Sequence, residues 1–294
     1  MYSADKKLEL IRKWGLEKIL PSRIMIPIYF EHHMNKKLNL KSPKTFNEKL
    51  QWLKLYYKNP AMTDLVDKIK VRDYIEERLG NEYLIPLIGV YDSFDEIDFT
   101  KLPNQFVIKC NHDSGSYILC ENKETFDINS AKEKINYHLN QNYYYYWREW
   151  PYKNVKPRIM IEQYMTNFEE DSFDDYKFLC FNGKADNVMV CTGRREGNTK
   201  FRFFDKQWNF KRYNYSGLQE KEGYTIKKPP CIDKMFEIAE ILAQDFPCVR
   251  VDLYCADEKV YFGELTFFPQ AGFDSQLLDS TDKLWGEKII LKKI

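Results

Sequence analysis

The chain has 294 residues, of which 44% are hydrophobic and 30% are charged, and its formal net charge is +1. We expect a soluble globular protein with one large domain or roughly two to three compact subdomains. The near-neutral charge excludes a general electrostatic attraction to nucleic acid. The seven cysteines include no C-x-x-C pair, so we expect reduced thiols and a cytoplasmic location. We expect neither a signal peptide nor a transmembrane segment, because the start is charged and the apolar run 19–30 is short and interrupted by prolines.

Residues 1–62 are predicted to form a helical N-terminal segment. Apolar residues recur there at helical spacing, as at Leu8, Ile11, Leu16 and Ile19. Thr45 followed by Glu48 predicts a capping box at the start of a helix. The adjacent His32 and His33 have no third ligand at a useful spacing, which favours a surface feature over a metal site. We therefore expect no chemistry in this segment.

The next elements are a helix and three strands. The helix is predicted from Thr63 to near Gly80, and Pro86 restricts the following strand, 83–91, to the edge of a sheet. A strand over 106–110 then carries Lys109 into a small polar loop, and a further strand follows at 117–120. Such a loop with free backbone N–H groups suits phosphate binding, although the P-loop spacing is absent. The alternative is an ordinary hairpin turn with a half-exposed lysine.

The middle of the chain combines a helix, an aromatic run and a hairpin. Ser130 and Glu133 predict a capped helix that extends to about Tyr146. The run 143–152 either provides a platform for a sugar ring, with Arg148 for a carboxylate, or packs between subdomains, and we favour the packing. A buried strand over 158–165 precedes an acidic loop.

A hairpin over 175–184 has an Asn-Gly turn, and its Lys177 lies on the face opposite Tyr176 and Phe178. After the next strand, Arg194 and its neighbour fit recognition of a phosphate or carboxylate or, equally, a solvent-facing position.

The most informative stretch is the predicted hairpin Val249–Phe273. Each of its two apolar strands carries one acid, Asp252 on the first and Glu264 on the second, and Arg250 points to the same face as Asp252. A carboxylate in a core strand is costly without compensation. Two converging carboxylates with no obvious Lys or Arg between them suit Mg²⁺ and nucleotide phosphates. The alternative is a hairpin with salt-bridged, exposed acids. An amphipathic helix over 232–244 precedes the hairpin, and a helix with a basic tail follows it.

These motifs, in this order, resemble the ATP-grasp carboxylate–amine ligases. The matching residues are Arg250-Val251-Asp252 and the run from Glu264 to Gly272, with Thr266 where most of the superfamily has Asn. The segment GELTFFPQAGF is similar to the TupA-like branch found in bacterial surface-polysaccharide gene sets. The resemblance implies an α+β ATP-grasp fold. After the helical segment 1–62, a small subdomain, 63–162, and a C-terminal subdomain with the metal site, 163–294, would clasp ATP between antiparallel sheets.

The resemblance also implies roles for individual residues. Lys68 and Lys109 would contact the phosphates of ATP, covered by Ser114, Gly115 and Ser116. The adenine would meet Glu162, Gln163 and Met165, and the ribose Asp175. Mg²⁺ would be held by Asp252, Glu264 and Thr266. Arg250, Lys177 and Arg194 would neutralise the transferring phosphoryl group.

The implied reaction joins a carboxylate to an amine through an acylphosphate. The TupA-like branch implies a uronic acid of a capsule or other surface-polysaccharide precursor and an amino acid or small amine, with the protein peripheral to a polysaccharide assembly complex. Two alternatives remain. One is a glycosyltransferase that uses a nucleotide-sugar, and the other is a non-catalytic nucleotide-binding partner.

Overall fold

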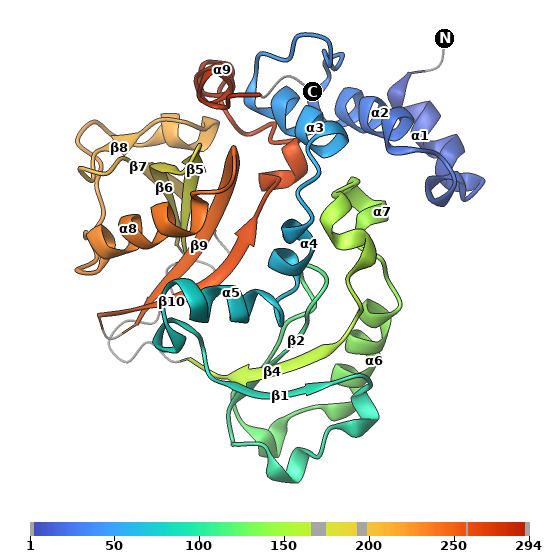
Figure 1. Ribbon diagram of the computed structural model, residues 1–294, viewed down its shortest axis with the longest axis vertical. Helices are drawn as coiled ribbons and strands as arrows, with labels where there is room; N and C mark the ends of the chain where they lie inside the picture. The colour runs from blue at the N-terminus through green and yellow to red at the C-terminus, as the bar shows by residue number, and fades with distance from the viewer. Residues whose placement is uncertain (1–2, 166–174, 193–198, 257, 292–294) are drawn as a thin grey trace.

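The computed structural model describes residues 3–165, 175–192, 199–256 and 258–291. Within these ranges the chain forms nine α-helices and two antiparallel sheets (Figure 1). The helices are α1 (Ala4–Lys13), α2 (Ser22–Met34), α3 (Phe46–Tyr56), α4 (Ala61–Val66), α5 (Val71–Arg78), α6 (Ile128–Leu139), α7 (Tyr144–Trp147), α8 (Ile232–Ala243) and α9 (Asp279–Lys288). The predicted α+β class is confirmed. No described helix is both long and apolar enough to cross a membrane.

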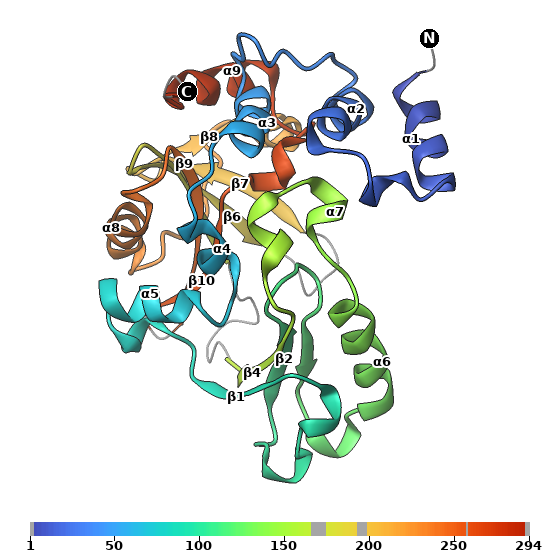
Figure 2. The ribbon, with the colours of Figure 1, turned by 45° about the vertical axis from the view of Figure 1, so that its right-hand side comes forward.

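The smaller sheet has four strands in the order β1-β4-β2-β3. They are β1 (Leu87–Tyr91), β2 (Phe106–Cys110), β3 (Ile118–Cys120) and β4 (Ile159–Gln163). α6 lies along one face of this sheet in both ribbon views (Figures 1 and 2), and the two pack through a buried cluster that includes Phe106, Ile108 and Ile135. β1 pairs with β4 alone and forms an edge of the sheet, as the proline before it predicted.

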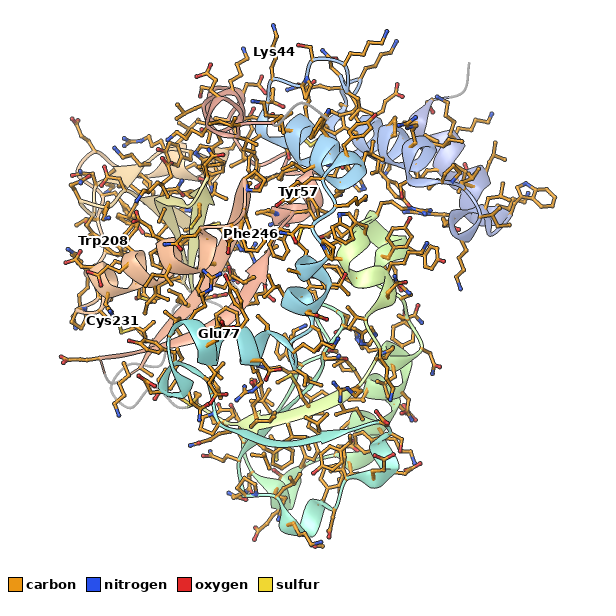
Figure 3. The ribbon with its side chains drawn as sticks, viewed as in Figure 1. Lys44, Tyr57, Glu77, Trp208, Cys231 and Phe246 are labelled. Carbon is orange, nitrogen blue, oxygen red and sulfur yellow. A yellow bond between two sulfur atoms is a disulfide. The ribbon has the colours of Figure 1, made fainter. Side chains whose placement is uncertain are left out.

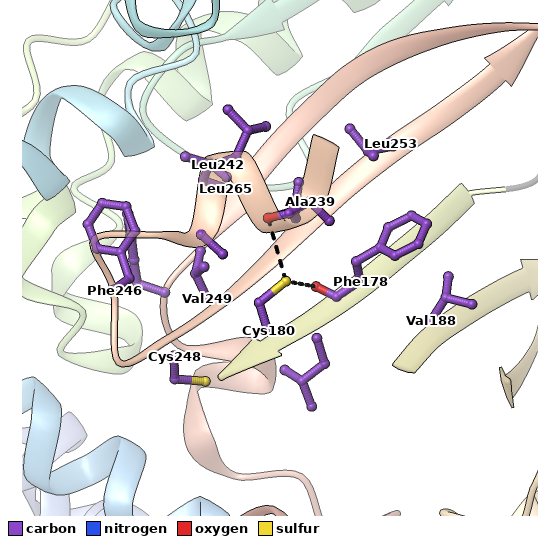
Figure 4. Close-up of a cluster of buried hydrophobic side chains, with 14 of the residues drawn as sticks. Phe178, Cys180, Val188, Ala239, Leu242, Phe246, Cys248, Val249, Leu253 and Leu265 are labelled. Atoms are coloured by element: carbon purple, nitrogen blue, oxygen red, sulfur yellow. Dashed lines mark hydrogen bonds between the residues drawn. The ribbon is translucent and has the colours of Figure 1, made fainter. Parts of the chain in front are cut away.

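The larger sheet has six strands in the order β10-β9-β5-β6-β7-β8. They are β5 (Asp175–Phe181), β6 (Lys184–Thr192), β7 (Lys200–Phe204), β8 (Phe210–Lys211), β9 (Cys248–Ala256) and β10 (Lys259–Thr266). α8 packs against one face through the main hydrophobic core. Figure 4 shows part of this core, where Phe178 and Cys180 of β5 contact α8 and the Cys180 thiol donates to the Ala239 carbonyl at 3.8 Å. Because side chains alternate along a strand, Lys177 faces away from this core.

The N-terminal helices pack onto a turn that follows β10. This turn, Pro269–Gly272, contacts α3, which also packs along α9. α1 and α2 share a hydrophobic cluster with Ala271 of the turn and with Phe273. The capping box of Thr45 and Glu48 at the start of α3 is confirmed. The helical segment is therefore attached to the end of the hairpin strand β10.

Two predicted helices have different boundaries in the structure. The helix expected from Thr63 to Gly80 is divided into α4 and α5 at Asp67, which has an extended backbone and accepts hydrogen bonds from the Ile69 N–H and from Asn111. The helix expected from Ser130 begins instead at Ile128, because Asp127 caps it by accepting from the Ser130 N–H at 3.0 Å. That helix ends at Leu139, and α7 is a separate short helix.

The prediction of reduced thiols is wrong for two of the seven cysteines. Cys231, labelled in Figure 3 and placed directly before α8, forms a disulfide with Cys255 of β9. The other five cysteines are buried and are not part of a disulfide in the described structure. These two cysteines are 24 residues apart and meet only because α8 folds back onto β9, so no closely spaced pair in the sequence indicates the bond.

Candidate active site

The predicted hairpin is formed by β9 and β10, and its register brings the two acids together. Asp252 lies directly opposite Glu264, and Arg250 lies opposite Thr266. The ladder shifts at Gly263, which acts as the extra residue of a bulge; a Cβ atom there would meet the Asp252 carbonyl oxygen at 3.0 Å. The intervening apolar side chains of both strands enter the main core. All four polar side chains therefore share the face opposite α8.

Arg250 holds this cluster together. Its Nε atom donates to Oδ1 of Asp252 at 2.6 Å, and one terminal nitrogen donates to Oδ2 at 2.8 Å. The same nitrogen reaches Oε1 of Glu264 at 3.1 Å and Oγ1 of Thr266 at 3.0 Å. The expectation that no Lys or Arg lies between the two acids is wrong, because Arg250 folds back across the strand pair and contacts both. The acids are nevertheless not a pair of exposed salt bridges, since Asp252 is only 1% exposed.

Lys177 joins the cluster from the neighbouring strand. It lies opposite Asp252 in the ladder between β5 and β9, and its ammonium contacts both that carboxylate and Asp175, the latter at 2.7 Å. Burial alone would raise the pKa of Asp252, but the charges of Arg250 and Lys177 outweigh burial and hold that pKa below its ordinary value. In the same way, burial alone would lower the pKa of Lys177, and the Asp252 charge raises it.

The cluster fits the coordination that Mg²⁺ prefers. No described group of three or more His, Cys, Asp and Glu residues could hold a metal without help. Asp252, Glu264 and the hydroxyl of Thr266 supply adjacent oxygen donors, and Mg²⁺ is usually bound by one or two carboxylates together with substrate phosphates. The Glu264 side chain is 42% exposed, and in the described structure its hydrogen bonds and ion pairs all involve Oε1, which leaves Oε2 available.

A second cluster of charges lies across a cleft between the hairpin and the smaller sheet. Lys109 of β2 contacts Glu162 of β4, with Nζ to Oε2 at 2.6 Å. Arg72 of α5 contacts the other oxygen of Glu162 at 3.2 Å and the Ile85 carbonyl at 3.0 Å. The cleft is lined further by Lys68 and by apolar side chains from α5, β4 and β10. Arg72 was missed from the sequence, because its local pattern does not distinguish it from a surface arginine of the predicted helix.

The polar loop after β2 has an internal framework and an exposed tip. The Ser116 hydroxyl donates to Asp113 at 2.6 Å and accepts from the Cys110 N–H at 2.9 Å. The Lys68 ammonium donates to the Asp113 carbonyl, which connects the loop to the segment between α4 and α5. Ser114 and Gly115 are exposed, and Gly115 has a left-handed φ of 94°. The loop is thus held at its base, and its exposed tip contacts Tyr143 through the Ser114 side chain.

A larger cavity of about 300 Å³ adjoins the Arg250 cluster. Its walls come from the polar loop, the aromatic run, the turn after β10 and α2. The lining residues are His33, Asp113, Ser114, Tyr143, Trp147, Glu149, Tyr152, Arg250, Glu264, Thr266, Phe268, Gln270, Ala271 and Phe273. The aromatic run therefore contributes to a cavity wall. Arg148 does not face this cavity; it is 1% exposed and donates to the carbonyls of Leu20 and Glu17.

Two buried charges of opposite sign lie beside this cavity. Burial raises the pKa of Glu149 to about 7, and burial lowers the pKa of Lys54 to about 7. The Lys54 ammonium donates to the Trp147 carbonyl at 2.8 Å and to the Ala271 carbonyl at 2.6 Å, so it fixes the aromatic run against the turn. Neither residue was singled out from the sequence, because nothing in their local patterns distinguishes them from surface charges.

The remaining predicted residues occupy the end of β4 and its continuation. Gln163 is exposed at the last position of β4, where its N–H donates to the Pro86 carbonyl at 2.9 Å. Met165 is half-buried just beyond it. Arg194 lies outside the described residues.

Comparisons with known proteins place the chain in a family. A family model described as TupA-like ATPgrasp matches residues 48–290. Among solved structures, D-alanine–D-alanine ligase from Bacillus anthracis is 16% identical, with a TM-score of 0.41 over 76% of this chain and 62% of that chain. The corresponding ligase from Helicobacter pylori is 12% identical, with a TM-score of 0.44 over 83% and 69%. D-cycloserine synthetase DcsG is also 12% identical, with a TM-score of 0.43 over 79% and 72%. This chain thus spans less than two thirds of the first of these structures. A search of curated proteins found no match.

Proposed function

The chain belongs to the TupA-like ATP-grasp family, and from this membership we propose that it is an ATP-dependent ligase that joins a carboxylate to an amine. The observation that carries the proposal is the facing pair of Asp252 and Glu264 beside Arg250 and Lys177. Across the cleft lie Lys109 and other cationic groups, so that charges suited to a nucleotide triphosphate converge from two sheets.

ATP would bind in the cleft between the hairpin and the smaller sheet. Lys109 and Lys68 would contact its phosphates, and Ser114, Gly115 and Ser116 would cover them, with the exposed tip of that loop closing over the triphosphate. The adenine would lie against the apolar walls near Glu162, with Gln163 and Met165 at its edge and Asp175 at the ribose. In this proposal, residues 63–162 and residues 163–294 form the two subdomains that clasp ATP.

Mg²⁺ would be held by Asp252, Glu264 and Thr266, and when bound it supplies positive charge against the phosphate oxygens. Arg250 and Lys177 are already positioned by these carboxylates, so their charges lie beside the transferring phosphoryl group without reorganisation. We assign Arg194 the same neutralising role. The carboxylate substrate would attack the γ-phosphorus of ATP, the bond from that phosphorus to the β,γ-bridging oxygen would break, and ADP would leave as the acylphosphate forms. The amine then attacks the acyl carbon, and phosphate leaves with loss of a proton from nitrogen.

The substrates we propose are a uronic acid of a bacterial capsule or other surface-polysaccharide precursor and an amino acid or small amine. Family membership supports this class. The reaction would take place in the cytoplasm, where ATP is available, beside a polysaccharide assembly complex.

A thermal-shift experiment tests the nucleotide. ATP, ADP, UDP and UDP-glucuronate would each be added with and without Mg²⁺. We expect a Mg²⁺-dependent rise in melting temperature with ATP or ADP alone, because a ligand far above its dissociation constant stabilises the native state by about 3–4 kcal/mol. Stabilisation by UDP or UDP-glucuronate, with none by ATP, would contradict the ligase proposal and favour a glycosyltransferase.

A trapping experiment tests the reaction. The protein would be incubated with MgATP, a panel of uronic acids and hydroxylamine, which converts an acylphosphate into a hydroxamate. Formation of hydroxamate that depends on both ATP and a uronic acid supports the proposal. Binding of MgATP without hydroxamate from any carboxylate in a broad panel, uronic acids and amino acids included, would contradict ligase activity and favour the non-catalytic alternative.

A further inference from the structure

The cavity of about 300 Å³ beside Arg250 has five phenylalanine, tyrosine and tryptophan side chains among its fourteen lining residues. Tyr143, Trp147 and Tyr152 come from the aromatic run, and Phe268 and Phe273 come from the end of the hairpin. The rings of Tyr143 and Tyr152 lie 4.9 Å apart, and those of Trp147 and Phe273 lie 6.0 Å apart. Aromatic faces attract ammonium groups because the ring quadrupole presents negative charge to them, and several rings around one space form a cage.

The charges that line this cavity are mainly negative. Among the described lining residues there are three carboxylates, those of Asp113, Glu149 and Glu264, and one guanidinium, that of Arg250. Arg250 is already paired with two carboxylates. Asp113 is paired with His138 and accepts a hydrogen bond from Ser116. The cavity therefore offers more negative than positive charge to a ligand.

Like Nε2 of His33, the Glu149 carboxylate lines this cavity without a hydrogen-bond partner among the described residues. Its side chain makes no hydrogen bond or ion pair within the described part of the chain, although the residue is only 4% exposed. The charge of Lys54 acts on it, but the Lys54 ammonium is committed to the carbonyls of Trp147 and Ala271. A buried carboxylate without a partner is costly, so this arrangement is expected where a ligand supplies the missing cation.

We propose that Glu149, together with Tyr143, Trp147 and Tyr152, binds the ammonium group of the amine substrate. That this ligand is a substrate rests on the proposed ligase function, whereas the ammonium site itself rests on the cavity. The ligand class is a primary ammonium ion, such as an amino acid or an alkylamine. The same cavity reaches Arg250 and Thr266, so an amine bound at Glu149 lies in the space that opens onto the candidate phosphoryl-transfer site.

A pair of probes of equal size tests this site without catalysis. n-Propylammonium chloride and neutral 1-propanol would be titrated into the full chain at pH 8 and low salt, with binding followed by saturation-transfer NMR. We expect the ammonium probe to bind at least tenfold more tightly than propanol. Equal affinities would overturn the proposal, and so would binding of methyl glucoside in place of the ammonium probe, which would make the cavity a platform for a neutral sugar.

Variants locate the effect at Glu149. Glu149→Gln should remove the preference for the ammonium probe, and Trp147→Leu should weaken ammonium binding by severalfold. Glu133→Gln changes an exposed glutamate on α6 and should leave binding unchanged. A preference that persists in Glu149→Gln would contradict the assignment. If Glu149→Gln does not unfold cooperatively and is therefore not properly folded, the Trp147→Leu variant provides the test. Undiminished ammonium binding in Trp147→Leu would overturn the aromatic cage.

Two further readings separate this site from the ligase function. If the wild-type protein responds to MgATP but shows no preference for the ammonium probe, the ligase proposal stands and the amine site is refuted. If it prefers the ammonium probe but does not respond to MgATP, the ammonium site stands and the ligase proposal is refuted. In an active assay, Glu149→Gln should raise the KM for a primary amine and leave the KM for ATP unchanged.

Discussion

At the scale of single residues, the polar groups of the hairpin are coupled by direct contacts. Arg250 and Lys177 both contact the buried Asp252, whereas Glu264 is paired through one oxygen and is partly exposed. Removing one member of a buried ion cluster leaves uncompensated charge, and the cost is typically about 3–5 kcal/mol. The two carboxylates should therefore differ in their contribution to stability.

We predict that Asp252→Asn and Glu264→Gln both abolish turnover but separate in stability. Asp252→Asn should lower the free energy of unfolding by roughly 3–5 kcal/mol, because it deprives two buried cations of their shared partner. Glu264→Gln should cost less than about 1 kcal/mol, because the side chain is partly solvated. Chemical denaturation of both variants measures the difference. Equal losses would show that Asp252 does not hold the cations as described.

The buried Glu149 predicts a dependence of stability on pH. Its pKa rises from 4.5 to about 7 on folding, so the folded state binds the proton more tightly than the unfolded state does. The stabilisation is fully present below pH 4.5 and is lost as the pH rises through 7, and it amounts to at most about 3 kcal/mol.

Urea denaturation of wild type and Glu149→Gln between pH 4.5 and 8 measures this effect. The wild type should lose stability relative to the variant as the pH rises. Lys54, Arg250 and Glu264 also act on Glu149, but they are common to both proteins, so the difference reports Glu149 and its coupling to them. A difference that does not change with pH would place the pKa of Glu149 near its ordinary value.

At the scale of elements, α3 determines the shape of the turn after β10. Gln51 donates to the carbonyls of Ala271 and Gly272, and Lys54 donates to that of Ala271. Three successive residues of this turn, Gln270 to Gly272, have left-handed φ values of 48°, 51° and 64°. Such a backbone is strained for residues other than glycine and persists only when its surroundings hold it.

Gly272→Ala should therefore be strongly destabilising. A Cβ atom there would meet the Gln51 Nε2 atom at 2.4 Å and Leu50 Cβ at 2.9 Å, in addition to the left-handed φ. Gly223 also has a left-handed φ, of 76°, but a Cβ atom at that position meets nothing within 4 Å. We expect Gly223→Ala to cost about 1 kcal/mol and Gly272→Ala to cost at least about twice as much. Thermal unfolding compares the two variants. Equal losses of stability would show that packing against α3 does not contribute to the effect of Gly272→Ala.

The disulfide connects α8 to the hairpin and predicts a redox effect on stability. Closing a loop with a sequence separation of 24 restricts the unfolded chain, so reduction should lower the free energy of unfolding by roughly 2–4 kcal/mol. Denaturation with and without dithiothreitol measures this change. The double variant Cys231→Ser with Cys255→Ser should be insensitive to the reductant. A wild type that is equally insensitive would indicate that the two cysteines are not bonded in solution.

At the scale of the whole molecule, the features that could be predicted are those encoded locally. The alternation of apolar and polar residues around Asp252 and Glu264 indicated the hairpin, and the Asn-Gly pair after β5 indicated its turn. Thr45 and Glu48 indicated the start of α3 for the same reason. In each case the physical cause lies within a few neighbouring residues, so the pattern and the structure coincide.

The features that could not be predicted depend on contacts between distant segments. His33, Glu149 and Phe273 line one cavity although more than 100 residues separate each from the next along the chain. Cys231 meets Cys255 only after α8 has packed. Arg250 was expected to serve a ligand alone, but its length lets it reach both carboxylates first. The local sequence pattern does not indicate such contacts between distant segments.

The way α2 and α3 hold the hairpin end has a consequence for how this chain can be divided or recombined. His33 forms part of the cavity wall, and Lys54 ties the aromatic run to the turn. We therefore expect that the first 62 residues cannot be detached without disturbing the cavity. A chimera that kept the two sheets and exchanged this segment for that of a distant relative would carry the charged hairpin intact but leave one side of its cavity open to water. We therefore expect that a chimera keeps the site intact only if the helical segment and the turn come from the same protein.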